Sequence, residues 1–136
     1  MNTALHQDLV WCLQALSQDA AQQRQLYPDF VHLADELVLD FDQALDVAGR
    51  DILDRNPDLA ALDALIDSKG GLSDYWSDEA LEGSTFWQEI RARARNALTN
   101  RDLPVAMPGT PPSGMYYVEG NVGWRDRLAV WFRRKT

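Results

Sequence analysis

The chain has 136 residues, of which 46% are hydrophobic, and a formal net charge of −8. This length suits one domain with room for a core, and this composition excludes intrinsic disorder. The charge is uneven: residues 1–90 hold 18 acids and 4 bases, giving −14, whereas residues 91–136 hold 3 acids and 9 bases, giving +6. The acidic majority argues against nucleic-acid binding, which needs concentrated positive charge, and favours a basic protein partner.

The single cysteine, Cys12, excludes an internal disulfide and any multi-cysteine metal site. It lies in an apolar helical stretch and is expected to be a buried small hydrophobe. No run approaches the roughly 18 apolar residues of a membrane span, and the N-terminus lacks the basic region of a signal peptide. The sequence therefore predicts a cytoplasmic protein that does not bind a membrane.

The first predicted helix spans residues 3–16, with Thr3 as its N-cap. Its apolar stripe consists of Leu5, Leu9, Cys12, Leu13 and Leu16. Ser17 is the expected cap of a short polar turn or helix that runs through Leu26. Tyr27 precedes a proline, which disfavours the helical conformation, so a boundary is expected there.

The longest helical pattern covers residues 28–49, and the other elements are expected to pack around it. A turn of about 100° per residue gathers its apolar residues on one broad face. That face consists of Phe30, Leu33, Ala34, Leu37, Phe41, Ala44, Leu45 and Ala48. Such a broad face is typical of a helix packed against several neighbours. Pro28 suits the first turn, and Gly49 suits the left-handed conformation that ends a helix.

The opposite face of this helix carries three acids around one leucine. One interpretation is a solvated face with a single exposed leucine. The other is an apolar knob ringed by carboxylates, which steer a basic partner toward it. The predicted partner-binding residues are Asp35, Leu39, Asp42 and Asp46. If these four are buried against the basic C-terminal third, a second acidic set becomes the candidate: Asp58, Asp63, Asp67, Asp74, Asp78, Glu79 and Glu82.

Asn56-Pro57-Asp58 has the pattern of a helix start, with a cap, a proline at the first helical position and an acid in the first turn. The helix is expected to run to about Ser68 and to end before Gly70-Gly71. The following stretch is less regular. Ser77 is a candidate cap for one short turn, and the large ring of Trp76 is expected to anchor this stretch to the core.

Ser84 or Thr85 begins the next strong helix, because Thr85 and Gln88 have the spacing of a capping box. Its apolar stripe consists of Trp87, Ile90, Ala94 and Leu98. Asn100 is its expected end.

Residues 101–123 are expected to form an ordered loop with some extended structure. Four prolines within residues 101–114 exclude a regular helix or a central strand there. Trp124, Leu128, Trp131 and Phe132 then recur at helical spacing. They predict a C-terminal helix over residues 124–134, and a strand over residues 127–132 is the competing interpretation.

No catalytic, cofactor-binding or metal-binding residue is predicted. The only histidines, His6 and His32, are expected to be ordinary surface residues. No glycine-rich phosphate loop is present. One group of carboxylates lacks the spacing of a calcium loop: Asp35, Glu36, Asp40 and Asp42. A set of arginines could bind phosphate, although pairing with the acids or solvation is the simpler expectation. These are Arg91, Arg93, Arg95, Arg101, Arg125, Arg127, Arg133 and Arg134.

Three stretches carry a resemblance to a known group: residues 26–30 (Leu-Tyr-Pro-Asp-Phe), 34–41 (Ala-Asp-Glu-Leu-Val-Leu-Asp-Phe) and 86–91 (Phe-Trp-Gln-Glu-Ile-Arg). In these, and in size, helicity and acidity over residues 1–100, the chain resembles small acidic proteins of bacterial contact-dependent and polymorphic toxin systems. More broadly, it is similar to helical immunity proteins. The resemblance implies a cytosolic protein that binds and blocks one toxin, and it transfers no individual functional residue.

We therefore predict a mainly α single domain over residues 1–136, a bundle of five or six helices closed by an irregular proline-rich C-terminal segment. The expected function is an immunity-type inhibitor that neutralises a basic toxin through an acidic surface, without enzymatic activity. One alternative is a chaperone or adaptor for a secreted partner, which would show a dimer interface or a large exposed apolar groove. A small enzyme with an unrecognised carboxylate site is the third interpretation.

Overall fold

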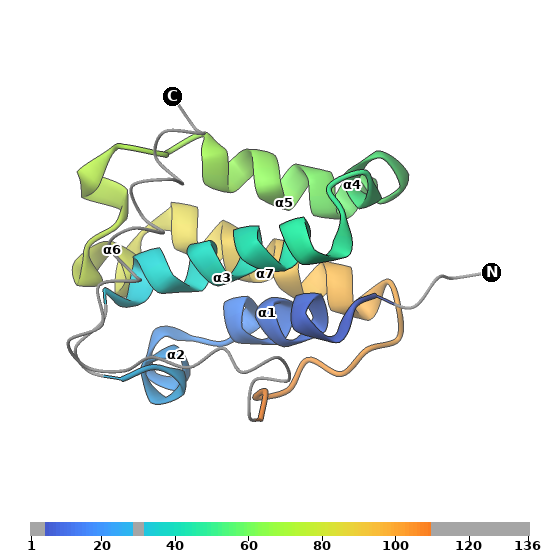
Figure 1. Ribbon diagram of the computed structural model, residues 1–136. Coiled ribbons are helices and arrows are strands. Elements are labelled where there is room, and N and C mark those ends of the chain that lie inside the picture. The colour runs from blue at the N-terminus through green and yellow to red at the C-terminus, as the bar shows by residue number, and fades with distance from the viewer. Residues whose placement is uncertain (1–4, 29–31, 110–136) are drawn as a thin grey trace.

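The computed structural model describes residues 5–28 and 32–109. This part of the chain is mainly helical, which confirms the predicted fold class, and it contains seven α-helices where five or six were expected. The elements in chain order are α1 (Gln7–Ser17), α2 (Ala20–Leu26), α3 (Leu33–Ala48), α4 (Ile52–Arg55), α5 (Pro57–Asp67), the 3-10 helix η1 (Ser73–Tyr75), α6 (Asp78–Gly83) and α7 (Thr85–Thr99) (Figure 1). The described residues contain no strand.

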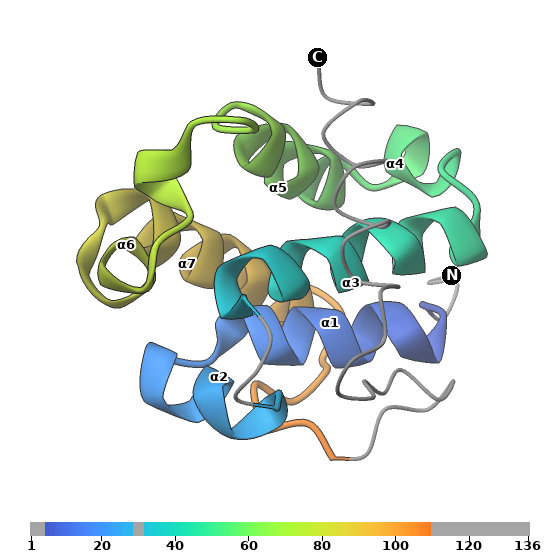
Figure 2. The same ribbon diagram turned by 60° about the vertical axis from the view of Figure 1, so that its left-hand side comes forward.

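Three long helices form the centre of the bundle. α1 packs on both α3 and α7, and α5 packs on the other side of α7. The short helices α2 and α6 lie together at one end of the bundle, and α4 lies at the opposite end beside the C-terminus of α3 (Figures 1 and 2). None of the helices in the described ranges is long and apolar enough to cross a membrane.

One continuous core fills the space between these helices. Its largest fully buried side chains are Trp87 on α7 and Phe41 on α3. The predicted stripe of α7 is buried throughout, as its helical spacing requires, and Ala97 joins it. Cys12 is also buried and forms no disulfide, as expected of a small hydrophobe.

The first two helices begin at residues other than those predicted. α1 is capped by His6, whose Nδ1 accepts a hydrogen bond from the Asp8 backbone N–H at 3.1 Å. Ser17 is still part of α1, and Asp19 caps α2 instead by accepting from Gln22 N–H at 2.9 Å. Ser17 and Asp19 are both short polar side chains that can cap a helix. The sequence pattern does not distinguish between two such candidates two residues apart. Thr3 lies outside the described residues.

The predicted start of α3 is also wrong, whereas its predicted end is confirmed. The helix begins at Leu33 with His32 in the N-cap position, and Pro28 lies outside it. Residues 29–31 are not described. Gly49 has a φ of +96° and donates its N–H to the Leu45 carbonyl at 2.9 Å, so the helix ends where glycine was expected to end it.

Three later helix starts follow the sequence pattern. Pro57 is at the first position of α5, and Ser84 caps α7 by accepting from Trp87 N–H at 3.2 Å. Ser77 likewise caps α6 by accepting from Ala80 N–H at 3.1 Å. Asn56 is in the N-cap position of α5, but its side chain donates to the Ile52 carbonyl and caps nothing.

Residues 101–109 leave α7 through a turn and contain no helix or strand. This segment lies along α1 (Figure 1), where Trp11 Nε1 donates to the Gly109 carbonyl at 2.8 Å and Gln14 Nε2 donates to the Pro104 carbonyl at 3.1 Å. The rest of the predicted loop, the predicted helix over 124–134 and the alternative strand over 127–132 lie outside the described residues.

Candidate functional site

The predicted partner-binding face of α3 is mostly buried. Leu39 is 3% exposed and belongs to the core, and Asp35 and Asp42 are buried as well. Every residue from Leu33 to Asp42 is buried, so α3 has no exposed face along this stretch. The interpretation of Leu39 as an exposed knob is therefore wrong.

Only Asp46 of this set is exposed, and it forms an ion pair with Arg50 at 2.7 Å. Arg50 also pairs with Asp42. The pattern of a helix reports which residues share a face, but it does not report whether another part of the chain covers that face. A role of Asp35, Leu39, Asp42 and Asp46 in partner binding stays a prediction, and Asp46 alone has the exposure that it needs.

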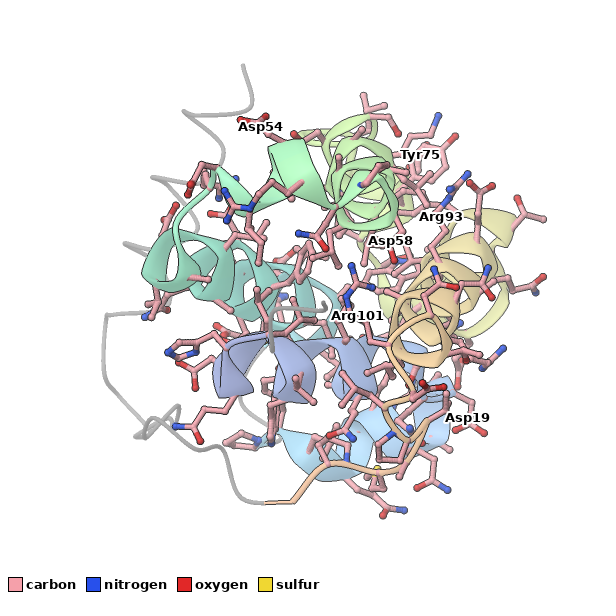
Figure 3. All side chains as sticks on the ribbon, turned by 90° about the vertical axis from the view of Figure 1, so that its right-hand side faces the viewer. Asp19, Asp54, Asp58, Tyr75, Arg93 and Arg101 are labelled. Atoms are coloured by element: carbon pink, nitrogen blue, oxygen red, sulfur yellow. The ribbon has the colours of Figure 1, made fainter. Side chains whose placement is uncertain are left out.

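The second acidic set is divided by the structure into paired and unpaired members. Asp58 accepts from both terminal nitrogens of Arg101, at 2.6 and 2.8 Å, and the two side chains point toward each other (Figure 3). Glu82 pairs with Arg24 at 2.9 Å. Asp63 and Asp67 are half-buried. Since these four have partners or limited exposure, the remaining three acids are the better candidates for binding.

These three, which we call the acidic rim, are Asp74, Asp78 and Glu79. All are exposed, and none forms an ion pair with another residue of the described ranges. Asp74 belongs to η1, and the other two belong to the first turn of α6. The rim thus presents three negative charges within six residues of the chain.

A pocket lies beside the acidic rim, at the corner where the start of α3 meets η1 and α6. Its volume is about 440 Å³, within the range of about 300–1,000 Å³ typical of small-molecule sites. The described residues that line it are Asp35, Gly71, Ser73, Trp76 and Ser77. Gly71 has a φ of +81°, a conformation that favours glycine, and it turns the chain between α5 and η1. We call this the Asp35 pocket.

Asp35 supplies the only ionisable group among these lining residues. This residue is 9% exposed, and its Oδ1 has no hydrogen-bond partner among the residues that the structure describes. Burial raises the pKa of this carboxyl to about 6, and the charge of His32 opposes that rise. The pocket is therefore lined by a carboxyl group whose pKa is raised to about 6 and whose Oδ1 receives no hydrogen bond from the described residues.

The tryptophan of the pocket is held rigidly by its neighbours. Trp76 Nε1 donates to the Lys69 carbonyl at 2.8 Å. Its ring meets Phe86 and Trp87 edge to face, with centroids 5.6 and 5.9 Å away. Trp76 thus packs against the core, as the size of its ring predicted. What the sequence did not reveal is that the same ring lines a pocket containing Asp35.

The described residues show no group of three or more histidine, cysteine or acidic side chains that could hold a metal ion. His6 caps α1, and His32 is exposed in the N-cap position of α3.

The arginines of the predicted basic set do not gather at one place among the described residues. Arg93 pairs with Glu89 at 3.0 Å, and Arg101 pairs with Asp58. Arg125, Arg127, Arg133 and Arg134 lie outside the described residues.

Arg91 departs from the expectation of pairing with an acid or remaining solvated. It is 8% exposed and donates to the Gln18 carbonyl, to Gln23 Oε1 and to the Leu81 carbonyl, at 2.9, 2.9 and 2.6 Å. The sequence contains one indication of this burial: Arg91 directly follows Ile90 and therefore borders the apolar stripe of its helix.

Comparison of the chain with protein-family models, with curated proteins and with solved structures finds no match. The site therefore has to be interpreted from its own geometry and charge.

Proposed function

We propose that this protein is an immunity-type inhibitor that binds a basic toxin, with the acidic rim at the centre of the contact. The carrying observation is the exposure of Asp74, Asp78 and Glu79 without ion pairs among the described residues. These residues belong to the acidic stretch 1–90, which holds 18 acidic and 4 basic side chains, a formal net charge of −14. Unpaired carboxylates on such a background attract a basic protein and accelerate its encounter.

Apolar contact is available next to these charges. Leu72 is 50% exposed and lies two residues before Asp74. Tyr75, in η1, is half-exposed. Aromatic and apolar side chains at the centre of an interface supply most of the affinity, while surrounding charges supply rate and specificity. Leu72 thus supplies the apolar contact that the sequence assigned to Leu39.

The experiment is a capture from lysate and secreted fraction, at low and high salt, followed by an inhibition assay. We expect one basic protein, held at low salt and weakened at high salt, whose toxicity to producing cells is relieved when this chain is made with it. The rim variant Asp74→Asn/Asp78→Asn/Glu79→Gln should weaken both effects.

The matched control removes three exposed acids elsewhere, as Asp51→Asn/Asp54→Asn/Asp102→Asn. It changes the net charge equally, so an equal loss would assign the effect to overall charge and not to the rim. A captured protein that is not toxic, or is not inhibited, would count against the proposal. A dimeric chain that delivers its partner in active form would support the chaperone or adaptor.

An enzyme is the second candidate, because the Asp35 pocket holds the perturbed carboxyl that such an activity requires. A carboxyl with a pKa near 6 can serve as a general base at neutral pH. The other polar side chains lining the pocket are Ser73 and Ser77, and the latter already caps α6. A screen of small substrates against the wild type and Asp35→Asn tests this candidate.

A further inference from the structure

We infer that the Asp35 pocket binds an organic cation, an ammonium or guanidinium group, and that its natural occupant is a lysine or arginine side chain of the basic partner. The choice of occupant rests on the proposed function, whereas the inference that the pocket binds an organic cation is independent of it.

The first argument is the unused carboxylate. Asp35 is 91% buried, and within residues 5–28 and 32–109 nothing donates a hydrogen bond to its Oδ1. A buried carboxylate without donors is costly, and a bound group that donates hydrogen bonds removes this cost. Binding of an anion is disfavoured, because Asp35 lines the pocket and the residues of the acidic rim follow the lining residues Ser73 and Ser77 in the chain.

The second argument is that the other side chains at the site suit the same ligand. The hydroxyl oxygens of Ser73 and Ser77 can accept hydrogen bonds from a cation. The Trp76 ring lines the pocket beside them. This ring is fixed by its hydrogen bond to Lys69 and by Phe86 and Trp87. Because the packing already orders Trp76, binding loses little side-chain entropy there.

The third argument is charge outside the pocket. The acidic rim places Asp74 next to Ser73, and Asp78 next to Ser77. A positively charged group approaching this corner therefore meets exposed carboxylates before it reaches Asp35. Outer charges that steer a ligand and an inner charge that binds it are a common arrangement for recognising basic side chains.

The test is an NMR titration of the full chain at pH 7.5 with n-butylguanidinium and n-butylammonium, and with n-butylurea as the neutral control. The readout is the Trp76 indole N–H signal, assigned by its absence in Trp76→Phe. We expect both cations to shift it saturably and n-butylurea to leave it unchanged. Asp35→Asn keeps the shape of the side chain and should weaken the cations about tenfold or more. Asp54→Asn, at an exposed acid in α4, should not.

Equal binding of n-butylurea, or unchanged cation binding in Asp35→Asn, would overturn the inference. The captured partner then identifies the source of the cation. A parallel loss of partner affinity in Asp35→Asn supports a partner side chain. Loss of small-cation binding alone overturns that choice and assigns the pocket to a free amine. If no partner is captured, the proposed function fails, while the titration still decides whether the pocket binds cations.

Discussion

The junction of α7 with α2 and α6 and the corner between α3 and η1 each bury a charged side chain. Arg91, at the first, is 8% exposed and donates three hydrogen bonds to two carbonyls and an amide oxygen. Asp35, at the second, is 9% exposed and has an oxygen without any donor. Both groups lose hydration, but only Arg91 recovers hydrogen bonds from the protein. The difference separates a polar group used for folding from one left available for a ligand.

A second carboxyl on the same helix strengthens this comparison. Asp40 is 1% exposed, more buried than Asp35, and accepts a hydrogen bond from the Tyr27 hydroxyl at 2.8 Å. The chain can thus place a donor opposite a buried acid on α3. Natural sequences depart from such local consistency mainly at functional sites. Asp35 differs from Asp40 in two ways: its Oδ1 receives no hydrogen bond from the described residues, and it lines a pocket.

The largest expected effect tests whether α3 is held by the core, so that a change at Asp35 can be interpreted locally. Phe41 is 1% exposed. We expect Phe41→Ala to lower the free energy of unfolding by about 3–5 kcal/mol, through lost burial and a cavity. Denaturant unfolding measures this. A loss below about 1 kcal/mol would show that Phe41 does not face the core and would remove the basis of the comparison.

The next effect tests the Arg91 side of the comparison. Arg91→Met keeps much of the side-chain volume but removes the donor of two buried acceptors, on Gln23 and Leu81, and of the partly buried Gln18 carbonyl. We expect a loss of about 2–4 kcal/mol in the free energy of unfolding. Arg93→Met, two residues away, removes only an exposed pair with Glu89 and should cost less than about 0.5 kcal/mol. Equal effects of the two substitutions would mean that the buried hydrogen bonds of Arg91 are not stabilising.

Arg91 also shows how far the sequence can be taken. Helical periodicity predicted the fold class, the C-terminal ends of α3 and α7, and the apolar stripe of α7, because each depends on local spacing and capping. It did not predict that Arg91 is buried. The carbonyl and amide acceptors of Arg91 come from residues 10 to 73 positions away. Only the tertiary arrangement brings them together.

The candidate site shows the same limit. Asp35 was assigned to a partner-binding face by helical spacing, and the residue does belong to the site proposed above. The expected exposure of that face was wrong, because Leu39 and Asp42 are buried as well as Asp35. The pocket is completed by residues 71–77, which follow a different helix. No local pattern links these two segments, so the acids could be enumerated from the sequence but not sorted into buried, paired and available ones.

The third prediction tests the cost of leaving Asp35 without a donor. Burial raises its pKa from 3.8 to about 6, and the one charge identified as acting on it is His32. Between these values the folded state binds more protons than the unfolded state, so this carboxyl lowers stability as the pH rises through about 6. Asp35→Asn removes that penalty and should stabilise the protein at pH 7.5 by about 1–3 kcal/mol.

Unfolding free energies of the wild type and Asp35→Asn, measured from pH 4 to pH 8, provide the readout. The advantage of the variant should grow between about pH 4 and pH 6 and then level off. Combined with weaker cation binding, a gain in stability would mark Asp35 as a group kept for binding at the expense of stability. A loss of stability at pH 7.5 would instead mean that the carboxylate already has a favourable partner.

The smallest effect uses a carboxyl with the opposite shift. Hydrogen bonds from Arg101 lower the pKa of Asp58 from 3.8 to about 2. Its stabilising contribution is therefore complete above about pH 4 and is lost as the pH falls through about 2. Because Asp58 is partly exposed and its charge is screened, we expect Asp58→Asn to cost about 1 kcal/mol at pH 7. Acid unfolding should show this cost shrinking below about pH 4 and disappearing as the pH falls through about 2. The effect of Asp35→Asn, in contrast, disappears below about pH 4 and has the opposite sign. Two carboxyls with opposite pH slopes would establish that Asp35 differs from a paired acid in the same fold, and slopes of one sign would remove that distinction.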